Sequence, residues 1–127
     1  MNELIEEGLM IKSGTRTYAE QDALYAIGRT VEKNRSPVTN AKGGQSNHNF
    51  GIAWDVGIFD GGKYYTGATA KEETAFKNLG DHIKAQVNGI EWGGDWKSFV
   101  DRPHYQCKTD KSTSQVRALF QAGRSYL

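Results

Sequence analysis

Two short segments of the sequence combine histidine with aspartate at spacings that suit a metal site. In the first segment, His48 stands at the end of a polar stretch and Asp55 lies inside an otherwise apolar one. In the second segment, Asp101 and His104 flank Pro103. A buried, unpaired carboxylate is costly, so Asp55 requires a cation, a metal or several hydrogen-bond donors. Two histidines and an aspartate, supplied by two strands, would form an open zinc site that leaves the fourth position to water.

Asp101 is a candidate for the base that acts on such a water molecule. Zinc lowers the pKa of a bound water to about 7, and a nearby carboxylate can take up the proton. Because Pro103 cannot donate to a strand ladder, we place Asp101 in the loop before His104, where both side chains can converge. Each residue also has a plainer interpretation, since a lone histidine is more often packed or exposed and an aspartate near a proline is usually a turn residue. Spacing alone leaves both interpretations open.

Three capping signals predict the helices that must position these residues. Each places a Thr or Ser hydroxyl three residues before a Glu or Gln: Thr17–Glu20, Thr69–Glu72 and Ser112–Gln115. We expect the first helix to run to about Lys33, with an inner face of Ala23, Leu24, Ile27 and Val31. The second carries apolar residues at helical spacing: Phe76, Leu79, Ile83 and Val87. The third is short and is stopped by Gly123.

Short apolar runs between turn signals predict the strands. They are Leu9–Lys12, Gly51–Phe59, 63–65, Gly89–Trp92 and His104–Cys107. Residues 34–47 are polar and indicate a long loop, and Leu4–Gly8 fits the last turn of a helix. Helices and short strands are mixed without regular βαβ spacing, so the expected fold class is α+β.

Asp55 has a defined place on its strand because side chains alternate between the two faces. It shares a face with Ala53 and Gly57, and these small residues should leave an open hollow in front of the carboxylate. The opposite face carries the apolar residues of the segment and should face the core: Ile52, Trp54, Val56 and Ile58.

The composition restricts the class of protein. The chain has 127 residues with 16 basic and 15 acidic side chains, which indicates one domain and argues against nucleic-acid binding through bulk charge. A single cysteine, Cys107, excludes an intramolecular disulfide framework and a cysteine-rich zinc module. The apolar runs are too short for a membrane span, and the acidic amino terminus lacks the layout of a signal peptide. We therefore expect neither membrane insertion nor an export signal.

The two histidine and aspartate segments together resemble a known signature. The first reads Ser46-x-His48-x-x-Gly51-x-Ala53-x-Asp55, and the second reads Asp101-x-x-His104. This pairing resembles the zinc signature of the D-alanyl-D-alanine carboxypeptidase and L-alanyl-D-glutamate endopeptidase family of peptidoglycan metallopeptidases. The resemblance runs from about Ile11 to His104, and residues 13–17, 20–29 and 39–44 are similar to the endopeptidases of phage endolysins and bacterial autolysins. It implies a small antiparallel sheet flanked by helices, as in hedgehog-type relatives of this fold.

The resemblance also implies roles for individual residues. His48, Asp55 and His104 would bind Zn²⁺, and Asp101 would be the catalytic base. Arg16 matches an arginine that the family places near the substrate carbonyl or carboxylate, where a planar donor fork suits an oxyanion. Further positions are expected to line the substrate site: Ser46, Gln21 and Trp96. For Trp92, core packing is the favoured interpretation.

The expected function is zinc-dependent hydrolysis of the peptide stem of bacterial peptidoglycan, at the L-alanyl-D-glutamate bond. The alternatives are a D-alanyl-D-alanine carboxypeptidase and a non-catalytic, zinc-containing module for wall binding or signalling. We expect one monomeric catalytic domain over residues 1–127, shorter at its amino end than family domains and without a cell-wall-binding domain. If it comes from a phage, the enzyme would wait in the host cytoplasm until it is released to the wall.

Overall fold

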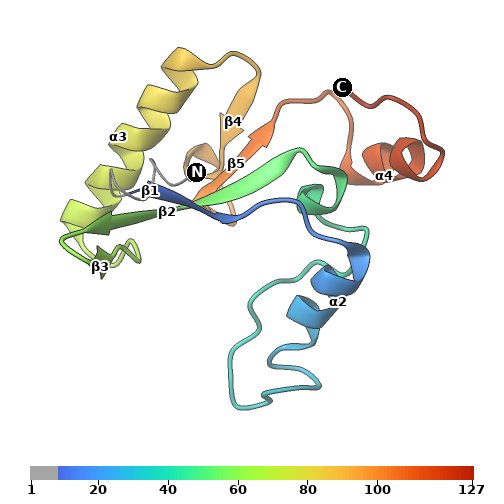
Figure 1. The fold of residues 1–127 in the computed structure, drawn as a ribbon, viewed down its shortest axis with the longest axis horizontal. Helices are drawn as coiled ribbons and strands as arrows, with labels where there is room; N and C mark the ends of the chain where they lie inside the picture. The colour runs from blue at the N-terminus through green and yellow to red at the C-terminus, as the bar shows by residue number, and fades with distance from the viewer. Residues whose placement is uncertain (1–8) are drawn as a thin grey trace. The chain divides into compact units, whose positions relative to one another are not determined.

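The computed structural model describes residues 9–127 and has an α+β fold, as the mixed pattern of elements predicts. In chain order its elements are β1 (Leu9–Ser13), α2 (Tyr18–Ala26), η1 (Asn47–Phe50), β2 (Ala53–Asp60), β3 (Lys63–Tyr64), α3 (Ala70–Gln86), β4 (Ile90–Trp92), η2 (Gly93–Asp95), β5 (His104–Cys107) and α4 (Thr113–Gln121), where η marks a 3₁₀ turn (Figure 1). The helical turn expected at Leu4–Gly8 lies outside the described residues. Across residues 9–127, no helix combines the length and the apolar character needed to cross a membrane. The described chain divides into two compact units, residues 9–14 with 53–108 and residues 15–52 with 109–127.

The first unit is built on an antiparallel sheet in the order β1-β2-β5-β4, with β3 paired to β2. Tyr105 of β5 lies directly opposite Trp54 of β2 and Trp92 of β4. Because neighbouring residues alternate between faces, these aromatic residues share one face of the sheet, while Asp55 and His104 share the other. The sheet therefore separates an apolar face from a polar one.

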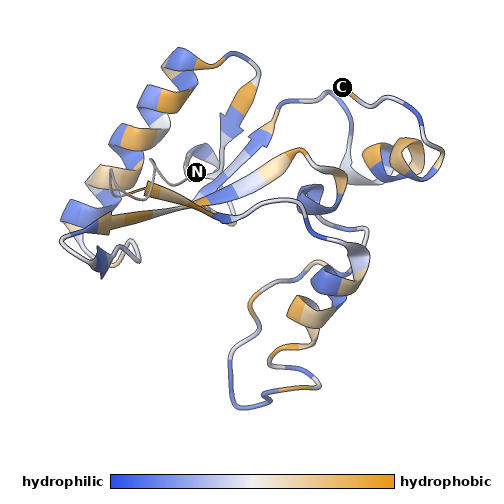
Figure 2. Ribbon diagram, in the orientation of Figure 1, coloured by the Kyte–Doolittle hydropathy of each residue, from blue (hydrophilic) through white to orange (hydrophobic). Residues whose placement is uncertain are grey.

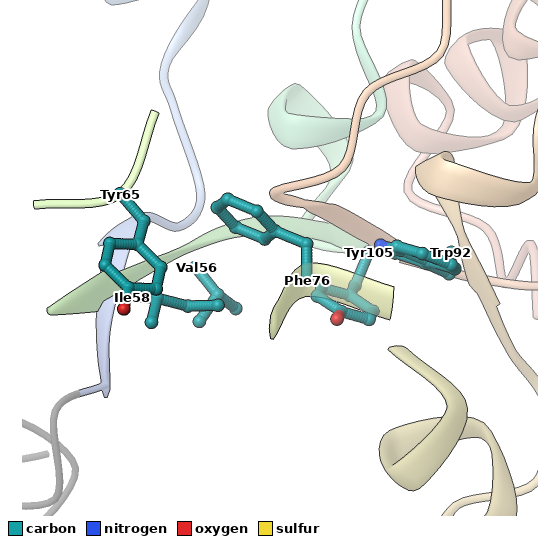
Figure 3. Close-up of a cluster of buried hydrophobic side chains, with 6 residues drawn as sticks. All are labelled: Val56, Ile58, Tyr65, Phe76, Trp92 and Tyr105. Carbon is teal, nitrogen blue, oxygen red and sulfur yellow. The ribbon is translucent and has the colours of Figure 1, made fainter. Parts of the chain in front are cut away.

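The helix α3 covers the apolar face of the sheet (Figure 1). The buried core of this unit contains six residues, drawn in Figure 3: Val56, Ile58, Tyr65, Phe76, Trp92 and Tyr105. Gly80 allows a close approach of α3, because a Cβ there would lie 2.6 Å from Cδ2 of Trp92. Figure 2 shows hydrophobic and hydrophilic bands alternating along α3, as expected for a helix with one buried side.

The predicted inner face of α3 is confirmed except at Val87. Phe76, Leu79 and Ile83 lie in the core or pack against it. Val87 follows the last residue of α3 and keeps 48% of its surface exposed. Its backbone is extended, with φ −128° and ψ 120°, so its side chain leaves the line of the helical face.

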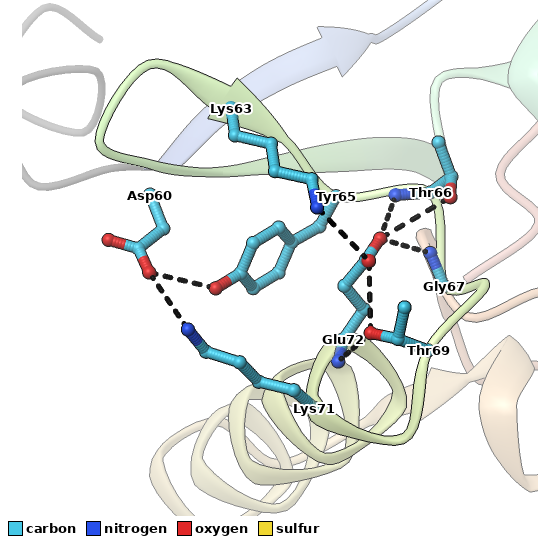
Figure 4. A network of polar contacts seen from close by, with 8 residues as sticks. All are labelled: Asp60, Lys63, Tyr65, Thr66, Gly67, Thr69, Lys71 and Glu72. Carbon is cyan, nitrogen blue, oxygen red and sulfur yellow. Dashed lines mark hydrogen bonds and ion pairs between the residues drawn. The ribbon is translucent and has the colours of Figure 1, made fainter.

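The start of α3 departs from the predicted capping box. Thr69 accepts the backbone N–H of Glu72, as expected for an N-cap. The Glu72 carboxylate, however, accepts the backbone N–H groups of Thr66 and Gly67 at 2.7 and 3.2 Å (Figure 4). The bond from Thr66 is the main cause that holds the pKa of Glu72 below its usual value. Glu72 thus ties the helix to the preceding turn instead of completing the box.

In the second unit, α2 is shorter than predicted and ends at Ala26 instead of about Lys33. The cap residue Ile27 has extended dihedral angles, and Gly28 follows with φ +81°. A Cβ at Gly28 would lie 2.6 Å from the carbonyl oxygen of Arg35. The chain folds back on itself here, which a side chain would prevent, and this contact ends the helix.

The inner face predicted for α2 is correct only in part. Leu24 and Ile27 are half-buried, whereas Ala23 and Val31 are exposed. Val31 is exposed because the helix ends before it is reached. The buried residue of α2 is Gln21, a polar residue.

The helix α4 and the turn η1 pack together in the second unit. The predicted capping box of Ser112 and Gln115 at the start of α4 is confirmed. Phe120 of α4 lies against Phe50 of η1, with ring centroids 5.2 Å apart. Tyr126 donates its hydroxyl proton to the carbonyl oxygen of Phe50. These contacts hold η1, and with it the segment around His48, against the end of the chain.

Candidate functional site

Asp55 and His104 face each other across two neighbouring strands. They are directly paired residues of β2 and β5, and Nδ1 of His104 lies 3.3 Å from Oδ1 of Asp55. Both side chains are largely buried, with 19% of Asp55 and 10% of His104 exposed. A carboxylate oxygen beside an imidazole nitrogen is a pair of ligand atoms that Zn²⁺ commonly takes in proteins.

Protonation of His104 is governed by opposing effects. Burial disfavours the charged ring, whereas hydrogen bonds with Asp55 and Gln106 and the negative charges of Asp55 and Asp101 favour it. The net effect raises the pKa of His104 above its usual value. The surroundings of His104 therefore favour a positive charge on its ring. The carboxylate and imidazole donor set fits a metal cation.

The hollow expected in front of Asp55 is filled on one side. Gly57 lies on the same face of β2, but a Cβ there would lie 3.0 Å from Cε2 of Tyr64 and 3.3 Å from Cγ of Met10. The missing side chain of Gly57 makes room for these neighbours from β3 and β1. The prediction of open space is therefore wrong at Gly57.

Two further polar residues lie beside His104 on the same face of the sheet. Nε2 of His104 is 2.8 Å from Oε1 of Gln106. Gln106 donates its amide N–H to Oε1 of Glu91 at 2.9 Å, and Glu91 is the residue directly opposite it on β4. Trp96 donates its indole N–H to Oε2 of Glu91 at 3.3 Å, and its ring centroid lies 5.1 Å from that of His104. His104, Gln106, Glu91 and Trp96 thus contact one another in a closed ring.

Sequence reasoning missed both Gln106 and Glu91. Gln106 follows His104 by two residues, so alternation along the strand places both side chains on the same face. The position of Gln106 beside His104 could therefore have been predicted from the sequence. The position of Glu91 depends on the register between β4 and β5, which the sequence does not specify locally.

Asp101 lies in the loop before β5, as predicted. Its backbone N–H donates to the carbonyl oxygen of Gly93 at 3.0 Å, and the N–H of His104 donates to the carbonyl oxygen of Asp101 at 3.2 Å. Trp92, which is buried in the core as expected, donates its indole N–H to the carbonyl oxygen of Arg102 at 2.6 Å. These bonds tie the 101–104 turn to the sheet and leave the Asp101 side chain exposed.

His48 belongs to the second unit and lies in the turn η1. Oγ of Ser46 accepts the backbone N–H of His48 at 3.2 Å, so Ser46 caps the turn. Gly51 ends it with φ +72°, a conformation that favours glycine. The His48 ring is buried, with 4% exposed. The serine and glycine of the motif thus shape the turn that holds His48, and contact of Ser46 with substrate stays a prediction.

Arg16 lies in the same unit as His48. Its backbone N–H donates to the carbonyl oxygen of His48 at 2.9 Å, and its Nη1 donates to Oε1 of Gln21 at 3.0 Å. Gln21 is fully buried, and its amide N–H donates to the carbonyl oxygen of Ala41 at 2.8 Å. Gln21 therefore helps to orient the Arg16 guanidinium, and direct contact of Gln21 with substrate stays a prediction.

The predicted site residues fall into two groups, one in each unit. The sheet unit brings together Asp55, Trp96, Asp101 and His104. The other unit brings together Arg16, Gln21, Ser46 and His48.

Comparison with known protein families decides the family of this chain. The family model described as D-alanyl-D-alanine carboxypeptidase matches residues 39–107. The match covers more than half of the chain and includes both segments that combine histidine with aspartate. The chain belongs to this family. The family resemblance of the two segments is thereby confirmed.

Curated relatives of the chain carry a more specific activity in their names. The peptidoglycan L-alanyl-D-glutamate endopeptidase CwlK of Bacillus subtilis is 38% identical over 101 residues, which are 77% of this chain and 59% of the relative. The L-alanyl-D-glutamate peptidase of Listeria phage A118 is 65% identical over 23 residues, which are 18% of this chain and 8% of the relative. The crystal structure of the Serratia marcescens L-Ala D-Glu endopeptidase ChiX matches with a TM-score of 0.47 and 24% identity, over 79% of this chain and 66% of that one. The chain thus spans less than two thirds of each of these proteins.

Proposed function

We propose that the protein is a zinc-dependent peptidase that hydrolyses the peptide stems of bacterial peptidoglycan. The observation that carries the proposal is the Asp55–His104 pair, a largely buried carboxylate and imidazole at 3.3 Å whose surroundings favour a positive charge. Membership of the D-alanyl-D-alanine carboxypeptidase family supports a peptidase. The name of the Bacillus relative supports peptidoglycan as the substrate.

His48, Asp55 and His104 would hold the zinc ion. Each offers one ligand atom, an imidazole nitrogen or a carboxylate oxygen, and such a set could hold a metal ion. Three protein ligands leave a position for water, which is the arrangement of catalytic zinc sites and not of structural ones. When bound, zinc supplies a Lewis acid that lowers the pKa of water and polarises the scissile carbonyl group.

The side chains of this protein would handle the protons and the developing charge. Asp101 accepts a proton from the attacking water and returns it to the leaving amine as the carbon–nitrogen bond breaks. Its exposed position on the 101–104 turn leaves the carboxylate accessible to substrate. Arg16 donates N–H groups to the oxyanion that develops on the carbonyl oxygen, and Gln21 keeps the guanidinium in place for this role.

The proposed site of cleavage is the L-alanyl-D-glutamate bond. Two relatives, from Bacillus subtilis and from Listeria phage A118, have this bond in their names. A second candidate is a D,D-carboxypeptidase, which the description of the matching family model favours. The two activities differ in their products. The endopeptidase exposes new D-glutamate amino termini, and the carboxypeptidase releases free D-alanine.

Digestion of purified peptidoglycan by the full chain, followed by mass spectrometry of the fragments, tests this proposal. We expect new D-glutamate amino termini, their loss when a chelator is added, and their return when zinc is restored. His48→Ala should abolish cleavage, whereas His82→Ala should retain it, because His82 is exposed on α3. Release of D-alanine alone would support the second candidate. Binding of zinc and of wall material without any cleavage would contradict both enzymatic activities.

A further inference from the structure

We infer that Glu91 and Gln106 are positioning residues that decide which ring nitrogen of His104 is available to a metal. The inference rests on the proposed function, since it concerns the ligand set of the proposed zinc site. It is carried by the ring of contacts on the polar face of the sheet, in which each group has a fixed role as donor or acceptor.

The direction of these hydrogen bonds is set first at Trp96. An indole N–H can only donate, so Oε2 of Glu91 accepts from Trp96 at 3.3 Å. The second carboxylate oxygen of Glu91 also only accepts when the group is ionised, and it lies 2.9 Å from the Gln106 amide nitrogen. Glu91 therefore requires the NH₂ group of Gln106 on its side, which turns the Gln106 carbonyl oxygen toward His104.

The orientation of Gln106 in turn decides the tautomer of His104. A carbonyl oxygen cannot donate, so the bond of 2.8 Å between Oε1 of Gln106 and Nε2 of His104 requires the proton on Nε2. In the neutral ring the lone pair is then on Nδ1. Nδ1 is the nitrogen that lies 3.3 Å from Oδ1 of Asp55. With the proton on Nε2, Nδ1 is the nitrogen that can bind a cation together with Oδ1 of Asp55, and this cation would replace the hydrogen bond that Asp55 accepts when the ring is charged.

The geometry of the sheet makes this arrangement rigid. Asp55 and His104 are direct partners on β2 and β5, and Glu91 and Gln106 are direct partners on β4 and β5. Backbone hydrogen bonds between the strands hold both pairs in register, so the metal does not have to order these four side chains. Hydrogen bonds of this kind to a ligating histidine fix its tautomer and orientation, and their loss weakens metal binding by roughly 10–100-fold.

Glu91→Gln is the most specific test, because it reverses the hydrogen-bond direction at nearly constant side-chain shape, and the tautomer reports this reversal separately from the loss of one negative charge. The carbonyl oxygen of the new amide would accept from Trp96, and its NH₂ group would then face Gln106. Gln106 would turn its own NH₂ group toward His104, which favours the tautomer with the proton on Nδ1. Gln106→Leu removes the acceptor altogether. Gln86→Leu is the matched control, since Gln86 is exposed at the end of α3.

Two measurements on the full chain report the effect. The first is the two-bond ¹H–¹⁵N correlation spectrum of histidine-labelled protein, without zinc and at alkaline pH, which distinguishes the two neutral tautomers. The chain has 3 histidines, so His104→Gln assigns the signals of His104. The second is the zinc dissociation constant, measured by competition with a chromophoric chelator. Thermal unfolding of each variant shows that it is folded.

The expected result is an Nε2–H tautomer in the parent protein and in Gln86→Leu. Glu91→Gln and Gln106→Leu should show an increased Nδ1–H population and bind zinc roughly 10–100-fold more weakly. A parent protein with its proton on Nδ1, or a Glu91→Gln variant with an unchanged tautomer whatever its zinc affinity, would overturn the inference. Failure of the parent protein to bind zinc at all would overturn the proposed function as well, so the two failures are distinguishable.

Discussion

Gly93 and Asp101 are in direct backbone contact across the turn that precedes β5. The N–H of Asp101 donates to the carbonyl oxygen of Gly93 at 3.0 Å. A Cβ at Gly93 would lie 2.3 Å from the carbonyl oxygen of Asp101 and 3.1 Å from Cβ of His104. Glycine is needed here because of this close approach, which brings the proposed base and a proposed zinc ligand onto one turn.

Replacement of Gly93 by alanine should therefore displace the 101–104 turn. We expect Gly93→Ala to lower the rate of peptidoglycan hydrolysis by at least about 10-fold and the free energy of unfolding by about 1–3 kcal/mol. Gly14→Ala is the control, because a Cβ at Gly14 has no neighbouring atom within 4 Å among the described residues. Turbidity loss of a wall suspension and urea unfolding measure the two effects. Equal behaviour of the two variants would show that the contact is unimportant.

Replacement of Asp101 should reduce the rate of hydrolysis without reducing zinc binding. We expect Asp101→Asn to bind zinc as the parent protein does and to lose activity by about 10²–10⁴-fold, because the amide cannot take up a proton. His48→Ala should lose the metal together with the activity. Asp110→Asn serves as the control, since 91% of the Asp110 side chain is exposed. Zinc content and the peptidoglycan digest check these outcomes, and full activity of Asp101→Asn would remove Asp101 from the mechanism.

Glu72 should make stability depend on pH on the acidic side. The backbone N–H of Thr66 holds the pKa of Glu72 below its usual value of 4.5 in the folded protein. The stabilisation is therefore complete above pH 4.5 and is lost as the pH falls through the lowered pKa of the folded state. Glu72→Gln should be less stable than the parent protein at pH 7, and the difference should shrink below pH 4.5.

Thermal unfolding across this pH range measures the effect of Glu72. Glu73→Gln is the matched control, because Glu73 is the next residue of α3 and its side chain makes an exposed ion pair with Arg102 at 3.5 Å. A difference between Glu72→Gln and the parent protein that stays constant from pH 7 to acid would mean that the carboxylate charge is not what stabilises the turn.

Tyr105 should behave unlike most buried tyrosines. Its side chain is fully buried, and its hydroxyl has no hydrogen-bond partner within the part of the chain that the structure describes. Burial, with a smaller effect of the Asp95 charge, raises the pKa of Tyr105 to about 12. Removing an unpaired polar group from a core relieves its desolvation cost, so Tyr105→Phe should be neutral or stabilising by up to about 1 kcal/mol.

Tyr65→Phe provides the comparison for Tyr105→Phe. The Tyr65 hydroxyl donates to Oδ2 of Asp60 at 2.9 Å (Figure 4), so its loss should lower the free energy of unfolding by about 0.5–1.5 kcal/mol. Urea unfolding of the two variants measures both values. A loss of stability in Tyr105→Phe as large as that in Tyr65→Phe would contradict the absence of a partner.

The sequence by itself determined the features that depend on residues close together in the chain. The capping boxes at Thr17 and Ser112 and the strand His104–Cys107 are confirmed. The predicted core face of β2 is confirmed at Trp54, Val56 and Ile58, whereas Ile52 precedes the strand. Local hydrogen bonds and the alternation of side chains are sufficient to specify such features. The turn around His48 is not predicted, because the sequence pattern places Gly51 in the following strand, whereas it ends η1 with φ +72° and β2 begins at Ala53.

Only the tertiary structure decided the features that depend on distant backbone. The helix α2 ends at Ala26 because Gly28 meets the chain at Arg35, and the hollow at Gly57 is filled by β1 and β3. Likewise, Glu91 reaches Gln106, and through it His104, only because β4 and β5 pair in one register. A shift of one residue in that register would move Glu91 to the other face of the sheet, and short-range patterns in the sequence carry no information about such pairings.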